Sequence, residues 1–598
     1  MASRQDRIDS YKKLIEEQEN KKLEVTSGDG KFTTLRVVSF GIACLTLAYA
    51  LLDGGISFWW TLIPVLAFAM IVMLHEGKLK LAGKAQKRIN FYQSGIRRIE
   101  GEWHDDGVQG EEFIDREHLF SRDLNLFGKA SLFQKISLCI TSFGRQRLAS
   151  WLLKPENVHD LPRRQEAIKE LSEDKELIAK FAELDIEETE TLEISTLKSW
   201  SAEGSKVYNP FVYFFSLFIG MLSLVTLVSW LFMGQTAWPF FICLVIDLVL
   251  GNTYAGKISK ITEGIASKEK NLLKLSLILK VLESSQYKSE MMSEINDKIR
   301  TDNMLASDRI EQIAYLIDTF ENTRSNLAIQ PFNILLHLNL RNAMKIEKWR
   351  KVAGASIPQW VEAAADFEAL VSLAVFTYEN PDYNFPDFVD EGPYLNAKSI
   401  GHPLLKPANC VRNDIELGKP VKLMLISGSN MAGKSTFLRT IGVNVVLAQA
   451  GAPVNAEKLQ ASPLNLGCSI QIEDSLAEGI SHFYAEILRL KKLVDLAQEE
   501  KNVLFFFDEI LHGTNSSDRC NGASAVIRSL VKGEAAGFVT THDLSLTSIA
   551  DELKEKAKNV HFEDQFEDGK MVFDYKMKEG IVTHGNALQL MRSLGLEV

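Results

Sequence analysis

Residues 422–440 read KLMLISGSNMAGKSTFLRT: an apolar run, a glycine-rich turn and a stretch compatible with a helix. Within it, residues 428–435 match the pattern G-x-x-x-x-G-K-[ST], whose backbone N–H groups wrap around phosphate oxygens at the start of a helix. The lysine of such a loop reaches the β- and γ-phosphates, and the hydroxyl residue holds Mg²⁺. The sequence therefore predicts ATP and Mg²⁺ as cofactors, with Lys434 and Ser435 in these roles. The predicted nucleotide-binding residues of the loop are Gly428, Ser429, Asn430, Met431, Ala432, Gly433, Lys434, Ser435 and Thr436.

A second motif points to the same site. Residues 502–514 read NVLFFFDEILHGT, in which an apolar run predicts a buried strand that ends in Asp508 and Glu509. A carboxylate at such a strand end can bind Mg²⁺, and a neighbouring carboxylate can act as general base on the attacking water. We predict that Asp508 binds the metal ion together with Ser435. We predict that Glu509 is the catalytic base and that Lys434 is catalytic beside it.

A third β-rich run, AAGFVTTHD at residues 535–543, ends in His542. A lone histidine is more often structural, but one at this strand end can touch the γ-phosphate and sense hydrolysis, so His542 is predicted to be catalytic. From about residue 380 onwards, short β-rich runs alternate with helical stretches. This alternation indicates a three-layer α/β domain with a largely parallel sheet.

Length and composition limit the classes of protein to consider. A chain of 598 residues is too long for one core. A formal charge of −11 does not indicate a dedicated nucleic-acid binder, so a DNA function needs other support. The six cysteines form no C-x-x-C pair, which fits reduced thiols and argues against a disulfide framework or a zinc site. No secretory signal peptide is expected at the N-terminus.

Four strongly apolar segments, in two pairs, predict two transmembrane helical hairpins. A hydrocarbon layer of ~30 Å needs about 20 apolar helical residues. Lysine and arginine are dense before the first segment and after the second, and the two turns carry none, so both turns are predicted to face outward. Asp247 would be costly in lipid and is expected to face another helix or the boundary. The segments are 35–52, 56–74, 208–233 and 237–251.

The alternative is two helical hairpins buried in a soluble core. Soluble helices rarely stay apolar on every face for so long, so spanning is favoured. We therefore predict a multi-pass protein of the cell (inner) membrane, with the lipid bilayer as a partner and all other parts in the cytoplasm.

Residues 110–207 and 255–372 carry apolar residues at three- and four-residue spacing and are predicted to be helical. The expected fold is an α/β P-loop (ABC-type) ATPase domain plus an all-α core/lever domain and four transmembrane helices. The predicted order is a cytoplasmic helical segment (1–34), hairpin 1 (35–74), the first part of the helical core (75–207), hairpin 2 (208–251), the second part of the core with the lever (252–375), and the ATPase domain with a C-terminal helix (376–598).

The motifs GSNMAGKST, DEILHGT and TTHD, in this order, resemble the ATPase domain of the MutS family, relatives of the ABC-type ATPases. Residues 474–493, DSLAEGISHFYAEILRLKKL, are similar to the signature helix of that family. The resemblance implies that Ser481 faces the γ-phosphate bound by the opposite subunit, and hence a homodimer. It also places Val411 near the adenine, where family members usually have an aromatic residue.

The resemblance continues outside the ATPase domain and has clear departures. Residues 123–155 and 164–171 look like the helical core and lever region, and residues 580–596 resemble the closing helix of the family. Ser429 stands where a proline is usual, and Gln471 where a basic residue is usual. We find no counterpart of the mismatch-reading domain, whose Phe-x-Glu wedge kinks DNA in repair proteins.

The expected function is that of a membrane-anchored, MutS-like ATPase that hydrolyses ATP at a composite dimer site and moves helical levers. Family membership implies a role related to DNA mismatch repair, with double-stranded DNA held through backbone contacts and no mismatch reading. One alternative is an ATP-driven, membrane-coupled conformational module that does not act on DNA. Transport and a scaffold with a vestigial ATPase are further alternatives, and the scaffold is disfavoured because Lys434, Ser435, Asp508 and Glu509 are all present.

Overall fold

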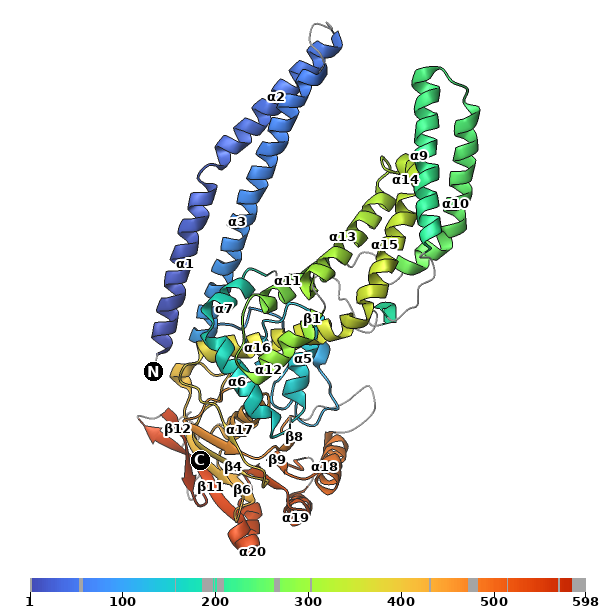
Figure 1. Ribbon diagram of the computed structural model, residues 1–598. Helices are drawn as coiled ribbons and strands as arrows, with labels where there is room; N and C mark the ends of the chain where they lie inside the picture. Colours follow the sequence, from blue (N-terminus) through green and yellow to red (C-terminus); the bar gives the residue numbers. More distant parts are fainter. Residues whose placement is uncertain are drawn as a thin grey trace.

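The computed structural model contains a central helical body, two projecting helical hairpins and an α/β domain. Both hairpins project from one side of the body, and the α/β domain lies on the opposite side (Figure 1). The structure describes residues 3–52, 58–155, 157–184, 197, 199–201, 209–262, 269–301, 304–429, 432–471, 482–512, 515–567 and 570–582.

The first hairpin consists of α2 (Asp29–Leu52) and α3 (Leu62–Glu100), and α1 (Arg4–Thr26) packs along the inner half of α3. Ser3 caps α1 in a capping box, since its hydroxyl accepts from the Asp6 N–H and the Asp6 carboxylate accepts from the Ser3 N–H. A Cβ on Gly95 would lie 2.5 Å from the Tyr11 ring, so glycine permits the close contact of α1 with α3. Because α3 is continuous, the domain boundary expected at 74/75 falls inside one helix.

The second hairpin consists of α9 (Pro210–Met233) and α10 (Trp238–Thr262). Asn209 caps α9 by accepting from the Phe211 N–H, Pro210 occupies the first turn, and Gly234 ends the helix with φ 64°. Among the described residues, four helical segments are long and apolar enough to cross a membrane: 4–52, 59–100, 210–233 and 238–259. Most of their apolar side chains point outward and are exposed, so a buried soluble core does not account for them.

The helical body is built around α16 (Ile357–Glu379), which is buried along nearly its whole length. It packs against α5, α6, α11 and α12, and β1 (Arg300–Thr301) pairs with β2 (Met304–Leu305). The other helices of the body are α4 (Leu132–Ile136), α5 (Ser142–Leu153), α6 (Asp160–Glu173), α7 (Lys175–Phe181), α11 (Glu269–Glu283), α12 (Glu290–Ile299), α13 (Ala306–Ser325), α14 (Gln330–Leu336) and α15 (Leu338–Ala353).

The prediction of helix from residue 110 onwards is wrong for residues 114–131, which form turns and irregular backbone. Asn125, Gly128 and Ala130 all have positive φ, a conformation that a right-handed helix excludes. Phe120, Leu124, Leu126 and Phe127 of this segment are buried all the same, because they pack between the helical body and the α/β domain.

The first hairpin is joined to the body by a buried ion pair. Arg98 of α3 donates from Nε and Nη2 to both carboxylate oxygens of Glu379 in α16, at 2.8 and 2.6 Å. The Tyr11 hydroxyl of α1 donates to the same carboxylate at 3.2 Å. The Glu379 side chain is 2 % exposed, so this carboxylate fixes the position of α1 and α3 on the core.

A second buried carboxylate, Glu368 of α16, holds the start of α5. It accepts from the backbone N–H groups of Ile140 and Thr141 at 2.6 and 3.1 Å, and from the Thr141 hydroxyl. Burial raises the pKa of Glu368 to about 7, although these hydrogen bonds oppose the shift.

We expect Glu368→Gln to change the pH dependence of stability. The folded-state pKa lies above the unfolded value, so the folded state binds the proton more tightly and wild-type stability falls as pH rises from about 4.5 to about 7. The free energy of unfolding of the variant, relative to wild type, should rise by roughly 2–3 kcal/mol between pH 5 and pH 8. Denaturant titration in detergent measures it, with the exposed Glu100→Gln as control. If the free energies of unfolding of Glu368→Gln and of wild type changed equally with pH, the prediction would be contradicted.

The α/β domain contains a sheet with the order β12-β11-β6-β10-β9-β8 in the described part of the chain. All neighbours are parallel except β11 and β12. Buried clusters of apolar side chains lie on both faces of this sheet, under α17 on one face and under α18 and α19 on the other. The prediction of a largely parallel sheet between helical layers is therefore confirmed.

The bounds of these elements are β6 (Leu423–Ser427), β8 (Asn465–Ser469), β9 (Val503–Asp508), β10 (Ala536–Thr541), β11 (Ala557–Glu567), β12 (Lys570–Glu579), α17 (Lys434–Gln449), α18 (His482–Glu499), α19 (Ser516–Lys532) and α20 (Ile549–Leu553). A second sheet packs beside the first, with the order β3-β7-β4-β5 among the described residues. Its strands are β3 (Asp387–Phe388), β4 (Leu395–Ile400), β5 (Asn413–Leu417) and β7 (Lys458–Ala461).

Candidate nucleotide site

The glycine-rich loop connects β6 to α17, as the sequence predicts. Gly428 has φ 147° and Gly433 has φ 90°. A Cβ at Gly428 would lie 2.6 Å from the carbonyl oxygen of Phe562, and one at Gly433 would lie 2.9 Å from the Tyr575 ring. Glycine is therefore required at both positions, because the loop runs against β11 and β12. Asn430 and Met431 lie outside the described residues.

Lys434, the first residue of α17, is buried inside its own loop. Its Nζ donates to the carbonyl oxygens of Gly428 and Ser429 at 2.8 and 2.9 Å, and lies 3.4 Å from Oε1 of Glu509. Burial lowers the pKa of Lys434, and the nearby carboxylates of Glu509 and Asp508 oppose the shift. The structure thus brings together the predicted phosphate-binding lysine and the predicted base.

Glu509 is held between Lys434 and two histidines. His512 Nε2 lies 2.8 Å from Oε2 of Glu509, and His542 Nδ1 lies 3.3 Å from Oε1. Burial alone would raise the pKa of Glu509, but the hydrogen bond to His512 and the charge of Lys434 outweigh it, so the pKa is lowered. The carboxylate is therefore ionised at neutral pH, as a general base requires. Its backbone has φ 49°, which turns the side chain away from the strand direction.

His512 is a site residue that the sequence reasoning did not single out. Its ring stacks on that of His542, with centroids 4.9 Å apart and planes at 24°. The available signal was its place in DEILHGT, three residues after the base, where a tight turn brings it back to Glu509. His512 contacts Oε2 of Glu509, whereas His542 and Lys434 both contact Oε1.

Asp508 ends β9 beside Thr540 of β10, whose hydroxyl donates to the Asp508 carboxylate. Ser435 lies in the first turn of α17 and is half-buried; Ala432 is buried and Thr436 is exposed. The hydroxyl of Ser435 and the carboxylate of Asp508 offer the oxygen ligands that Mg²⁺ prefers.

A second group of donor atoms lies next to this pair. Three possible ligand atoms lie within 4.8 Å of one another, one each from Glu509, His512 and His542. This mixture of nitrogen and oxygen donors suits a transition metal better than Mg²⁺. The same atoms already bond to each other and to Lys434, so the oxygen pair of Ser435 and Asp508 is the better fit for Mg²⁺.

The signature segment is described only from α18 onwards, and Ser481 lies outside the described residues. Within α18, Glu486 is buried and accepts from the Leu511 N–H at 2.6 Å, which links this helix to the turn after Glu509. Arg489 forms an ion pair with Asp123 at 2.8 Å. Asp123 also accepts from the backbone N–H of Gln471 at 2.7 Å. The irregular segment 114–131 is therefore attached to the strand end that precedes the signature.

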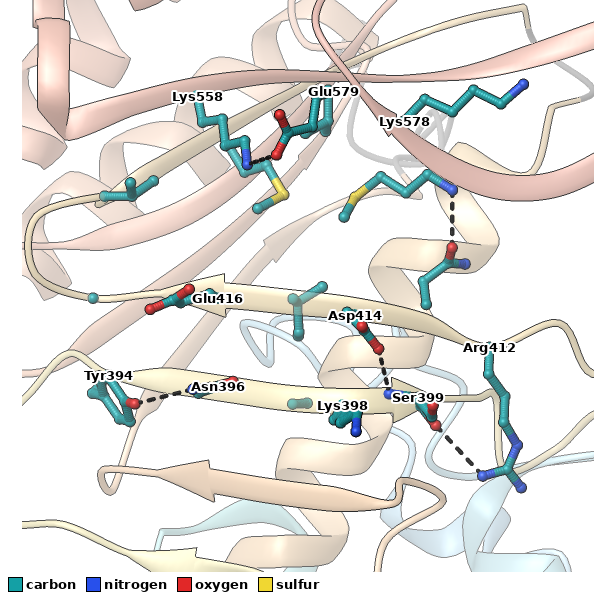
Figure 2. A pocket seen from close by; sticks show the side chains of 18 of the residues that line it. Tyr394, Asn396, Lys398, Ser399, Arg412, Asp414, Glu416, Lys558, Lys578 and Glu579 are labelled. Atoms are coloured by element: carbon teal, nitrogen blue, oxygen red, sulfur yellow. Dashed lines mark hydrogen bonds and ion pairs between the residues drawn. The ribbon is translucent and has the colours of Figure 1, made fainter.

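Val411 is half-buried between the loop after β4 and the start of β5. A cavity of about 770 Å³ lies nearby, between the β4–β5 pair and the β11–β12 pair (Figure 2). Neither Val411 nor the loop 428–435 is among its lining residues. Basic groups in this cavity already have partners, since Lys558 pairs with Glu579 at 2.5 Å. The cavity is therefore adjacent to the phosphate loop and separate from it.

Comparison with known proteins agrees with the geometry of the loop and of the strand ends. Residues 424–597 match the family description MutS domain V. The chain is 32% identical over 230 residues to the DNA mismatch repair protein MutS of Bacillus licheniformis, covering 38% of this chain and 26% of that protein. It is 30% identical over 269 residues to the DNA mismatch repair protein MSH6 of Arabidopsis thaliana, covering 42% of this chain and 20% of that protein.

The aligned region thus spans about a quarter or less of the length of these curated relatives. The family match begins in β6 and includes the loop, Asp508, Glu509 and His542. These matches confirm the resemblance noted in the sequence: residues 424–597 of this chain are similar to MutS domain V.

Proposed function

We propose that the protein is a membrane-anchored ATPase that hydrolyses Mg²⁺-bound ATP at the loop 428–435. The observation that carries the proposal is the position of Glu509. It is an ionised carboxylate at the end of a parallel strand, 3.4 Å from the lysine of the phosphate loop and oriented by two histidines. The similarity to MutS domain V supports ATP as the nucleotide.

The residues of the site suggest how the chain performs the reaction. Lys434 is held by two neutral carbonyls and by Glu509, and phosphate oxygens are stronger partners for an ammonium group. ATP binding would draw Lys434 from Glu509 to the β- and γ-phosphates. Glu509 would then keep only its contacts with His512 and His542 among these three partners. Glu509 would then accept the proton of the attacking water in an in-line displacement. Mg²⁺, held by Ser435 and Asp508, would neutralise charge on the phosphates.

We further propose a homodimer in which Ser481 of one subunit completes the site of the other. The link from Glu486 in α18 to Leu511 supports this arrangement, because it couples the signature helix to the turn that carries His512. Closure of two subunits around ATP would then act directly on the groups that orient Glu509.

The exposed apolar surface of the two hairpins supports a multi-pass position in the cell membrane. Both hairpins leave the body on the same side (Figure 1), so one bilayer can accommodate both while the body and the ATPase domain stay in the cytoplasm. The names of the relatives support a role related to DNA mismatch repair. We propose that the protein holds duplex DNA through backbone contacts and does not read mismatches.

The second candidate function is a membrane-coupled conformational module that does not act on DNA. The observation that favours it is the packing of α14 and α15 on α9 and α10. His337, between α14 and α15, lies 2.8 Å from Asp247 of α10 through its Nε2. Movement of this helical lever would therefore act on the second hairpin.

One experiment separates the two candidates: ATP turnover of the detergent-purified full chain, with and without duplex DNA. We expect duplex DNA to raise the rate, and the stimulation to fall steeply with salt because phosphate contacts release counterions. Homoduplex and heteroduplex DNA should act equally, and chelation of Mg²⁺ should abolish turnover. An unchanged rate with DNA at low salt would favour the membrane-coupled module.

A further inference from the structure

The end of the helical lever differs in composition from the rest of the body. Residues 325–340 contain no aspartate, glutamate, lysine or arginine, and Arg324 and Arg341 flank them. We call residues 325–340 the lever tip; it comprises the end of α13, all of α14 and the start of α15. Leu327 is 86 % exposed and Phe332 is 56 % exposed. An uncharged segment with exposed apolar side chains between two arginines is typical of a segment at a membrane.

The lever tip is docked against the second hairpin. A Cβ on Gly220 of α9 would lie 2.7 Å from the carbonyl oxygen of Leu335, so glycine allows the backbones to touch. On the neighbouring helix α10, Asp247 bonds to His337 at 2.8 Å and to Ser223 at 2.5 Å. Figure 1 shows α14 beside α9, well away from the central helix α16.

The helical rise gives the depth of these contacts in a bilayer. Gly220 lies thirteen residues before the end of α9 at Met233, which is about 20 Å of helix. Asp247 lies nine residues after the start of α10 at Trp238, which is about 14 Å. With the hairpin turn at the outer surface of a hydrocarbon layer of ~30 Å, both contacts lie inside the layer.

Arg341 marks the level at which the lever leaves that layer. Its guanidinium lies over the Tyr213 ring, 5.7 Å from the centroid. Tyr213 lies twenty residues before Met233, about 30 Å along α9, which is the inner boundary of the same layer. Tyrosine and arginine both favour this interfacial position.

The backbone of the lever tip is suited to an environment without water. The turns before α14 and α15 form three internal hydrogen bonds. The Ala328 N–H donates to the Asn326 side chain at 3.0 Å, and the Asn339 N–H donates to the Asn333 side chain at 2.9 Å. The Gln330 side chain donates to the carbonyl oxygen of Arg324 at 2.6 Å. Non-helical backbone at membrane depth requires such internal bonds.

Three polar side chains of the lever tip line a cavity toward the second hairpin, whereas Ser325 and Asn326 are exposed. A cavity of about 470 Å³ between α10, α13 and the tip is lined by Asn333, Asn339 and His337 from the tip, and by Asp247 and Asn252 from α10. Leu327 and Phe332 do not line this cavity and face the surroundings. The tip therefore places Asn333, His337 and Asn339 toward the hairpin, and Leu327 and Phe332 toward its environment.

We propose that the lever tip is a re-entrant membrane element: it enters the cytoplasmic half of the bilayer beside the second hairpin, and acyl chains cover Leu327 and Phe332. This inference rests on the proposed membrane anchoring and adds a third membrane segment to the two hairpins. It also explains how Asp247 can lie at this depth, because its carboxylate is hydrogen-bonded to His337 and Ser223 and does not face lipid.

The test is photolabelling of the full-length protein in phosphatidylcholine–phosphatidylglycerol vesicles that contain a lipid with a diazirine in its acyl chain. Labelled peptides are identified by mass spectrometry. We expect lipid adducts on both hairpins and on residues 326–336, and none above background on residues 306–315. The latter include Tyr315 of α13, which is 68 % exposed and so tests non-specific labelling.

Two variants make the test specific. Phe332→Glu places a charge at membrane depth and should reduce labelling of residues 326–336 to background while the hairpins stay labelled. Tyr315→Glu is the matched control, and it should change neither the labelling of residues 326–336 nor the labelling of the hairpins. Labelled hairpins with an unlabelled lever tip, or full labelling of the tip in Phe332→Glu, would overturn the re-entrant element and leave the anchoring intact. Absence of label on the hairpins as well would overturn the proposed anchoring.

Discussion

Replacement of Glu509 by glutamine should lower ATP turnover by about 10²–10⁴-fold, the usual contribution of a general base. Glutamine keeps the shape of the side chain and can still accept from His512, but it cannot take the proton of the attacking water. Nucleotide binding should persist, because Lys434 and the loop remain, and ATP should accumulate in a closed dimer. Single-turnover hydrolysis and sedimentation in the presence of MgATP measure the two effects.

Glu563→Gln is a suitable control for this variant. Glu563 of β11 is also bonded to a histidine and a lysine, His561 at 3.2 Å and Lys578 at 2.7 Å, but neither partner belongs to the phosphate loop. Its replacement should leave turnover within about twofold of wild type, because it removes a surface ion pair of little energetic weight. Wild-type turnover in Glu509→Gln would exclude Glu509 as the base.

The pKa of Glu509 is lowered, so this carboxylate stays ionised until the pH falls below the ordinary pKa range of glutamate. The ATP turnover of the wild-type protein should therefore decrease only below that range of pH.

Replacement of Glu379 by alanine should destabilise the junction of the first hairpin with the body by about 3–5 kcal/mol, the usual cost of leaving a buried charge without its partner. Arg98 is buried, and burial would lower its pKa, yet Glu379 keeps the pKa raised; the two charges therefore depend on each other. Tyr11 loses its acceptor in the same variant. Thermal unfolding in detergent should show the loss, and limited proteolysis should show early cleavage in α1.

Asp382→Ala provides the matched comparison at the same junction. Asp382 bonds to Arg4 at 2.8 Å and to Arg412 at 3.1 Å, but its side chain is 39 % exposed. Water can replace these partners, so the variant should lose less than about 1 kcal/mol. Equal losses in the two variants would mean that the buried carboxylate does not hold the hairpin in place.

The order of the elements in the α/β domain followed from local patterns. The apolar runs before Gly428 and Asp508 predicted strands because five consecutive buried side chains fit a strand covered on both faces. The glycines at 428 and 433 predicted a loop whose backbone wraps phosphate oxygens, and the structure shows a carbonyl and a ring where their side chains would lie. Such signals are carried by residues close in sequence, so one chain is sufficient to detect them.

Other features escaped the sequence because the partners lie far apart along the chain. Nothing near Arg98 identified Glu379, which is 281 residues away. The lever tip has too few apolar residues to be detected as a span, and only the structure shows its contacts with Gly220 and Asp247 of the second hairpin. His512 was visible in its motif, but its role depends on a stacking contact with a histidine from another strand end.

By itself, the sequence determined the phosphate loop, the acidic strand end and four long apolar helices, since composition and spacing over a few residues decide each of them. Only the tertiary structure decided which histidines orient Glu509, which carboxylate anchors the first hairpin and where the lever meets the second. Those contacts are set by how helices and strands pack, and packing energy belongs to surfaces that are assembled from distant parts of the chain.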